Sequence, residues 1–311
     1  MIIEALKLIK TLTMENKKQE TLFILGDKLK RKPFSPQLLE IRGGILCSMS
    51  LHKLAIKDFN LLIKLKEGTE ITSQIFFRMK VNWTLGRIEE AKEDANKVLA
   101  QLKDDRNPLS ALSRSKALSY LKRQDEALKE TELVEAHVDD FIVAIEKCRI
   151  FQLKGDFERA LEESIKVESS KHLVISSQTW LSAAKCEKAR CFAALGKIEE
   201  CISYTEDAYR IESDHSYVCW FRGIVFYLFT ERKEEARRIC LENKVHGKHR
   251  MKILLYYGEL IKGNPWFEKE IRAAVEILPE YSKLFSYRHP LEYLLPNKGF
   301  DVSKGEEGEI K

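Results

Sequence analysis

Apolar residues recur along most of the chain at the three- and four-residue spacing of amphipathic helices. The predicted helices come in pairs, and a short polar or glycine-containing turn separates the two members of each pair. In one pair, the pattern predicts a first helix over 141–153 and a second over 157–167, with Gly155 in the turn. Glycine suits a helix end because it adopts a left-handed backbone without steric penalty. The pattern therefore predicts consecutive helix–turn–helix units.

A small residue recurs near the start of the second helix of each unit. These residues are separated by 36, 36, 33, 41 and 35 positions, and they are Ala55, Ala91, Ala127, Ala160, Cys201 and Ala236. Two helices approach closely only where side chains are short, so small residues at this period indicate a stacked array of helix pairs. The longer interval before Cys201 places extra residues near 168–177, where we expect a local change in the superhelix.

Composition agrees with a folded helical protein. The 311-residue chain is 32% charged and 44% hydrophobic, and its net charge of +5 does not by itself indicate nucleic-acid binding. No proline lies between residues 109 and 264, which favours uninterrupted helices. We expect no signal peptide and no membrane span. The seven cysteines form no CxxC pair, and we interpret them as reduced core residues of a cytoplasmic or nuclear protein.

The sequence shows no arrangement of residues that is typical of catalysis. His246 and His249 are three residues apart, but no nearby carboxylate or cysteine completes a metal set with them, and Cys240 is the closest thiol. We therefore interpret this segment as a solvated basic loop. Gly43 and Gly44 lie inside a predicted helix, where close packing explains at least one of them. We therefore predict that the protein is not an enzyme and has no metal and no cofactor.

The repeat resembles that of the tetratricopeptide repeat family, whose units are 34 residues long. The resemblance covers about 37–243 and rests on residues such as Trp220, Gly223, Tyr227 and Ala236 in one unit. It implies an all-α, right-handed superhelical solenoid of antiparallel helix pairs. We expect a degenerate N-terminal repeat or cap over 1–35 and six clear pairs over 36–246. A degenerate repeat with a cap should follow over 247–300, and a disordered tail over 301–311.

In this family the first helices line a concave groove. The resemblance places four cations at one repeat position facing that groove, namely Lys80, Lys116, Arg149 and Arg190. Apolar and aromatic residues lie beside them, namely Phe76, Trp83, Leu112 and Tyr120. Such a surface suits an acidic peptide or helix with a few hydrophobic anchors. We therefore predict a non-enzymatic scaffold or adaptor that binds another protein through this groove.

A second basic column stands at another repeat position and consists of Arg42, Arg78, Arg114, Lys147, Lys188 and Arg222. Long basic side chains can pack their stems between helices while the charged heads stay outside. We interpret this column as mainly structural.

Two alternative functions stay open. The segment 188–236 looks like the repeats of DnaJ-type co-chaperones, which suggests a protein that holds unfolded clients. However, the chain has His289-Pro290-Leu291 where a J domain would need His-Pro-Asp. The carboxylate clamp that binds heat-shock chaperone tails is also absent, since Glu40 and Gly44 stand where it needs Lys and Asn. The second alternative is RNA binding by a helical-repeat surface. Helical-repeat proteins that bind RNA read one base per repeat with a regular set of side chains, and this sequence has no consistent polar pair at one repeat position.

Overall fold

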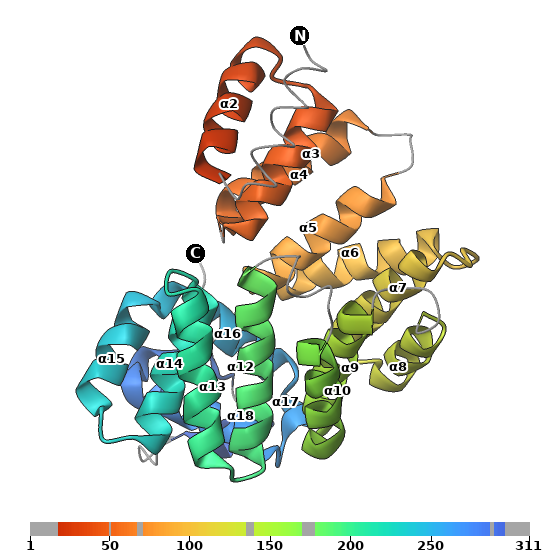
Figure 1. Cartoon of the computed structure of the whole chain (residues 1–311). Helices are drawn as coiled ribbons and strands as arrows, with labels where there is room; N and C mark the ends of the chain where they lie inside the picture. The colour runs from red at the N-terminus through yellow and green to blue at the C-terminus, as the bar shows by residue number, and fades with distance from the viewer. Residues whose placement is uncertain are drawn as a thin grey trace, which may run out of the picture.

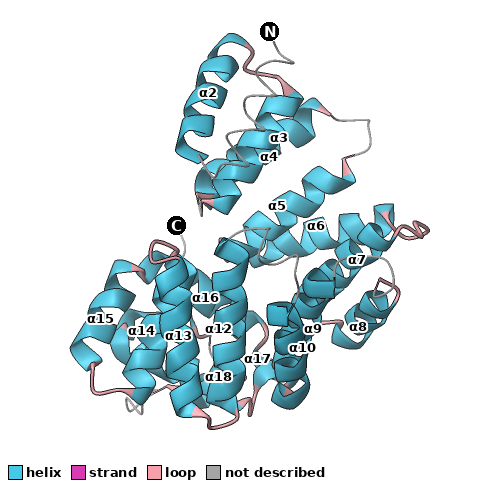
Figure 2. Cartoon of the chain, viewed as in Figure 1, coloured by secondary structure: helices cyan, strands magenta, loops and turns pink. Residues whose placement is uncertain are grey.

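The computed structural model describes residues 18–49, 51–66, 71–134, 140–169, 178–286 and 289–295. Within these ranges all regular secondary structure is helical, and no strand is present (Figure 2). Successive helices pack in pairs: α3 (Pro36–Ser48) with α4 (His52–Leu65), α5 (Thr72–Thr84) with α6 (Ile88–Gln101), α7 (Pro108–Tyr120) with α8 (Gln124–Glu132), α9 (Asp140–Lys154) with α10 (Phe157–Ser169), α12 (Gln178–Ala194) with α13 (Ile198–Ile211), and α14 (Ser216–Phe229) with α15 (Lys233–Glu242).

The pairs stack in chain order into a curved solenoid (Figure 1). Within the described residues, α2 (Lys18–Arg31) comes before these pairs and packs on α3. After them come α16 (Lys244–Tyr256), α17 (Gly258–Ile261), α18 (Pro265–Ile277) and two short 3₁₀ helices at Pro279–Leu284 and Glu292–Leu294. The all-α solenoid that the repeat predicted is therefore confirmed. The predicted tail over 301–311 lies outside the described residues, as does most of the loop expected over 168–177.

The turn inside the fourth pair follows from two adjacent residues. Gly155 has a φ of +80°, the left-handed conformation predicted for it, and it ends α9. Asp156 then begins α10, because its carboxylate accepts a hydrogen bond from the backbone N–H of Arg159. The chain thus reverses within a few residues, and the two helices pack antiparallel.

The small residues of the repeat mark the closest approach between helices. All six are completely buried, namely Ala55, Ala91, Ala127, Ala160, Cys201 and Ala236. A similar contact explains Gly43, where a Cβ atom would lie 3.0 Å from the ring of Phe59, whereas a Cβ on Gly44 would meet nothing within 4 Å. None of the seven cysteines forms a disulfide, and five of them are buried.

The second basic column joins neighbouring helices, both within pairs and between them. In three successive pairs, an arginine of the first helix binds a carboxylate sixteen residues later in the second: Arg42 with Asp58, Arg78 with Asp94, and Arg114 with Glu130. Lys188 and Arg222 are paired as well, with Glu168 and Glu206 respectively. The structural interpretation of these five residues is confirmed. Since carboxylates neutralise them, they do not form the basic surface that an RNA-binding protein would need.

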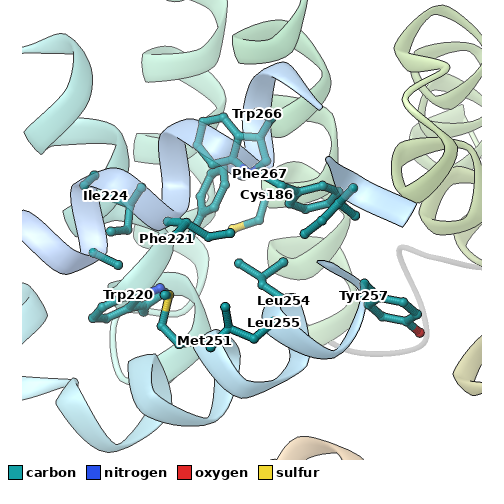
Figure 3. Close-up of a cluster of buried hydrophobic side chains, with 14 of the residues drawn as sticks. Cys186, Trp220, Phe221, Ile224, Met251, Leu254, Leu255, Tyr257, Trp266 and Phe267 are labelled. Atoms are coloured by element: carbon teal, nitrogen blue, oxygen red, sulfur yellow. The ribbon is translucent and has the colours of Figure 1, made fainter. Parts of the chain in front are cut away.

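The C-terminal helices turn back into the inner face of the solenoid. Helix α16 packs against α5 and α6, α17 against α9, and α18 against α12 and α14. Asn264 caps α18 by accepting from the N–H of Phe267, and it also donates to the carbonyl oxygen of Gln152 on α9 (2.9 Å). The large apolar residues of this part, including Trp220, Phe221 and Trp266, form the core shown in Figure 3. This core fixes the C-terminal segment across the curve of the repeats.

His289 also holds the C-terminal segment against α16. Its Nδ1 atom accepts from the backbone N–H of Leu291, so its Nε2 atom is left to donate to the carbonyl oxygen of Leu255, 3.0 Å away. The tripeptide that stands where a J domain would carry its motif therefore anchors the chain end to α16. Among the described helices, none is both long enough and apolar enough to cross a bilayer.

Candidate binding site inside the solenoid

A cavity of about 390 Å³ lies between the repeat helices and the C-terminal segment. The structure brings together at its wall the four cations predicted from the repeat, namely Lys80, Lys116, Arg149 and Arg190. They come from α5, α7, α9 and α12 in turn, because one repeat position faces the same way in each unit. A fifth cation, Arg250 of α16, also lines the cavity. The repeat pattern did not reveal Arg250, which lies beyond the clear repeats.

Three carboxylates partly neutralise these five cations. Glu146 accepts a hydrogen bond from Lys116 over 2.6 Å. Glu187 pairs with Arg190 and lies 3.8 Å from Arg149. Arg250 binds both oxygens of Glu270, at 2.8 and 3.0 Å. Five cations against three carboxylates leave an excess of positive charge on the inner face.

Lys80 is the cation of this group that the carboxylates leave uncompensated. No carboxylate of the described residues forms an ion pair with it, and its ammonium nitrogen lies 5.7 and 5.8 Å from the ring centres of Phe76 and Phe77. Burial and the nearby charges of Lys116 and Arg149 lower the pKa of Lys80 to about 8. A negative charge close to Lys80 would raise this pKa again, because it favours the charged ammonium form.

Arg190 is held rigidly by a buried polar network. It donates to the side-chain oxygen of Gln152 (3.1 Å) and to the hydroxyl of Tyr217 (3.0 Å), and it pairs with Glu187. The Tyr217 hydroxyl in turn donates to Glu187 over 2.8 Å. Burial alone would raise the pKa of Glu187, but Arg190 and Arg149 lower it below its usual value. The carboxylate is therefore ionised, and the network holds in place the part of the cavity wall that these residues form.

Two of the aromatic residues predicted as groove anchors, Trp83 and Tyr120, are covered by the C-terminal segment. Trp83 and Tyr120 stack with their ring centres 4.2 Å apart, and only 9% and 7% of their surfaces are exposed. The edges of Tyr256 and Tyr257 close over Trp83, at 5.7 and 5.4 Å. Both predicted residues line the cavity, so they form its aromatic wall rather than an open surface. The repeat pattern could not show this, because the covering residues lie beyond the clear repeats.

The other two predicted anchors lie outside the cavity wall. Phe76 and Leu112 are half-buried and stand one helical turn before Lys80 and Lys116 on the same helix faces. Leu109, at the start of α7, is 62% exposed. These apolar residues therefore lie on the same two helices as Lys80 and Lys116, toward the helix starts.

Three histidines also line the cavity, namely His52, His215 and His246. The segment around His246 was predicted as a solvated loop, but it forms the first turns of α16, with His246 half-buried. Burial, together with the charges of His215 and Arg250, lowers the pKa of His246 to about 3. Burial likewise lowers the pKa of His52 to about 4. Both rings are therefore neutral near pH 7, and within the described ranges no group of three or more metal-binding side chains has the geometry of a metal site.

Comparison with solved structures agrees with this architecture. A Rap protein in complex with competence and sporulation factor superposes with a TM-score of 0.56 at 13% identity, covering 91% of this chain and 97% of that one. The APC/C hetero-tetramer Cut9–Hcn1 gives a TM-score of 0.59 at 10% identity, covering 87% of this chain but only 51% of that one. A tetratricopeptide repeat protein of Thermus thermophilus gives 0.49 at 12% identity, covering 62% and 99%.

The likeness to these structures lies in the fold. No protein-family model matches the sequence, and no curated protein matches it significantly. The repeat length, the buried small residues and the stacked helix pairs together define a tetratricopeptide-repeat fold. Solenoids of this kind present extended concave surfaces for binding.

Proposed function

We propose that this protein is a non-enzymatic scaffold that binds an acidic, partly hydrophobic segment of a partner protein at the inner face of its solenoid. The observation that carries the proposal is the charge of the cavity, where five cations face three carboxylates. Complementary charge of this kind steers and orients an acidic partner.

The arrangement suggests how such a segment would lie. Its acidic groups would enter the cavity toward Lys80 and Arg149, the two cations that are least compensated. Its apolar residues would rest on Phe76, Leu112 and the exposed Leu109. The covered Trp83 and Tyr120 would contact only the part that reaches the cavity.

The structure also selects the substitutions that can test this function. Lys116 is bonded to the buried Glu146, so reversing its charge would place two carboxylates together and damage the fold. Lys80 and Arg149 can be neutralised more safely. Lys80 has no carboxylate partner among the described residues, and the Arg149 side chain is 35% exposed with only a 3.8 Å contact to Glu187.

The test is affinity purification from the native cell with three baits: wild type, the double variant Lys80→Met/Arg149→Gln, and Lys97→Met. Lys97 is an exposed lysine on α6, away from the cavity, so it serves as the matched control. Partners identified by mass spectrometry should be retained by wild type and by Lys97→Met and lost from the double variant. Circular dichroism should show equal helicity in all three baits. Full retention by a folded double variant would exclude the inner face as the binding surface.

A further inference from the structure

We infer that the cavity contains a ligand position for a dicarboxylate, in which Lys80 and Arg149 bind one carboxylate each. The inference deepens the proposed function, because it names the chemical group that the inner face accepts. It also concerns the isolated chain, so it can be tested without a partner.

The first support is the unequal pairing of the five cations. Lys116, Arg190 and Arg250 each have a close carboxylate, whereas Lys80 has none among the described residues and Arg149 shares Glu187 with Arg190. An uncompensated buried charge is costly to keep in a folded protein. The fold keeps Lys80 without a carboxylate partner among the described residues and gives Arg149 only a shared one at 3.8 Å. Both cations line one cavity, so the cavity is arranged for negative charge from outside.

The second support is a set of polar atoms that the fold leaves without partners. Arg190 is only 3% exposed, and its Nε–H has no hydrogen-bond acceptor among the described residues. The Nδ1 atoms of His52 and His215 and the Nε2 atom of His246 are also buried without partners there. All four side chains line the same cavity. Buried polar groups are rarely left unsatisfied, so their convergence indicates a missing ligand.

The shape of the cavity limits the size of that ligand. Its volume of about 390 Å³ is near the lower end of the range for small-molecule sites. Apolar and aromatic side chains line the cavity together with the charged groups, among them Trp83, Tyr120, Leu254 and Phe267. A short aliphatic chain with a carboxylate at each end matches both features. Such a group is found in a free diacid and in adjacent acidic side chains of a partner protein.

The experiment measures binding to the full-length chain by isothermal titration calorimetry. The ligands are glutarate, the acetylated and amidated dipeptide Glu-Glu, and glutaramide, which keeps the size of glutarate without its charges. Wild type and Lys97→Met should bind a dicarboxylate but not glutaramide. Lys80→Met should weaken that binding at least about tenfold, the effect of a lost charge-assisted hydrogen bond. Tighter binding of glutarate indicates a free diacid as the natural ligand, and tighter binding of the dipeptide indicates a partner segment.

Thermal unfolding without ligand separates a binding role from a structural one. If Lys80 awaits an external anion, Lys80→Met should be at least as stable as wild type, because methionine keeps the apolar stem and removes an uncompensated charge. If Lys80 serves mainly to pack on Phe76 and Phe77, the variant should be less stable and should bind the ligand normally, which would overturn the inference. Failure of wild type to bind either dicarboxylate would overturn it as well. A third outcome separates the inference from the proposed function. If wild type binds a dicarboxylate but the Lys80→Met/Arg149→Gln variant still retains the protein partners, the inference stands and the proposed function is refuted.

Discussion

The hydroxyl of Tyr257 donates a hydrogen bond to the carbonyl oxygen of Ser119 over 3.0 Å, although 138 residues separate the two in the sequence. Tyr257 follows α16, and Ser119 lies in the last turn of α7. The bond therefore joins the C-terminal segment to the third helix pair across the inside of the curve. It closes one side of the charged cavity, which both residues line.

Removing this hydroxyl should cost measurable stability. Tyr257 is buried, so Tyr257→Phe leaves the Ser119 carbonyl without this donor and should lower the free energy of unfolding by about 1 kcal/mol. Urea denaturation provides the measurement. The matched control is Tyr293→Phe, because Tyr293 is 49% exposed and water can replace its bond to Glu268. Equal losses of stability in the two variants would show that the bond between Tyr257 and Ser119 stabilises the protein no more than an exposed hydrogen bond does.

The ion pair between Arg78 and Asp94 should be far more important than its counterparts on the surface. Arg78 binds both oxygens of Asp94, at 2.9 and 2.6 Å, and the Asp94 side chain is only 3% exposed. Arg78→Met should destabilise the protein by about 3–5 kcal/mol because it strands a buried carboxylate. Arg123→Met should cost less than about 1 kcal/mol, since Arg123 and Glu126 are about half exposed. The double variant Arg78→Met/Asp94→Leu should recover much of the loss in the same denaturation experiment.

Two helical glycines should respond in opposite ways to alanine. A Cβ atom on Gly247 would lie 2.3 Å from the buried ring of Trp220, so Gly247→Ala should push α16 away from α14 and cost about 2–3 kcal/mol. Gly44 lies within α3 with nothing near its Cβ position, and Gly44→Ala should add about 0.5–1 kcal/mol. Differential scanning calorimetry would detect both changes. A neutral Gly247→Ala would mean that α16 does not sit against Trp220.

Acidification should lower the free energy of unfolding through the histidines that line the cavity. The pKa of His52 is about 4 and that of His246 about 3 in the folded protein, below the ordinary value of 6.5. Between pH 7 and pH 5 the unfolded chain therefore binds protons that the folded protein does not, so stability falls as pH falls. Each histidine should contribute a loss of about 2 kcal/mol over this range.

Urea denaturation at pH 7, 6 and 5 measures this dependence. His52→Gln should lose less stability than wild type over the same range, because glutamine does not titrate. A slope that is unchanged in His52→Gln would contradict the assignment of a depressed pKa to this residue.

The repeated unit could be predicted from the order of the amino acids alone. The period of the apolar residues gave helix pairs, and Ala91 or Gly155 could be placed in them correctly because their surroundings are local to one unit. The same period placed Lys80, Lys116, Arg149 and Arg190 on one line, because equivalent positions in a regular stack face the same direction. The sequence also allowed the arginines of the second column to be interpreted as structural.

The curvature of the solenoid and the segment that closes it depend on the fold of the whole chain. Small rotations between successive pairs accumulate, so whether α16 reaches α5 depends on all the intervening pairs together and not on any one unit. That closure buries Trp83 and Tyr120 under Tyr257 and brings Arg250 to the four predicted cations. Side-chain pairing was likewise beyond the repeat pattern, because the carboxylates of Glu146 and Glu187 compensate some cations and leave Lys80 without a partner among the described residues.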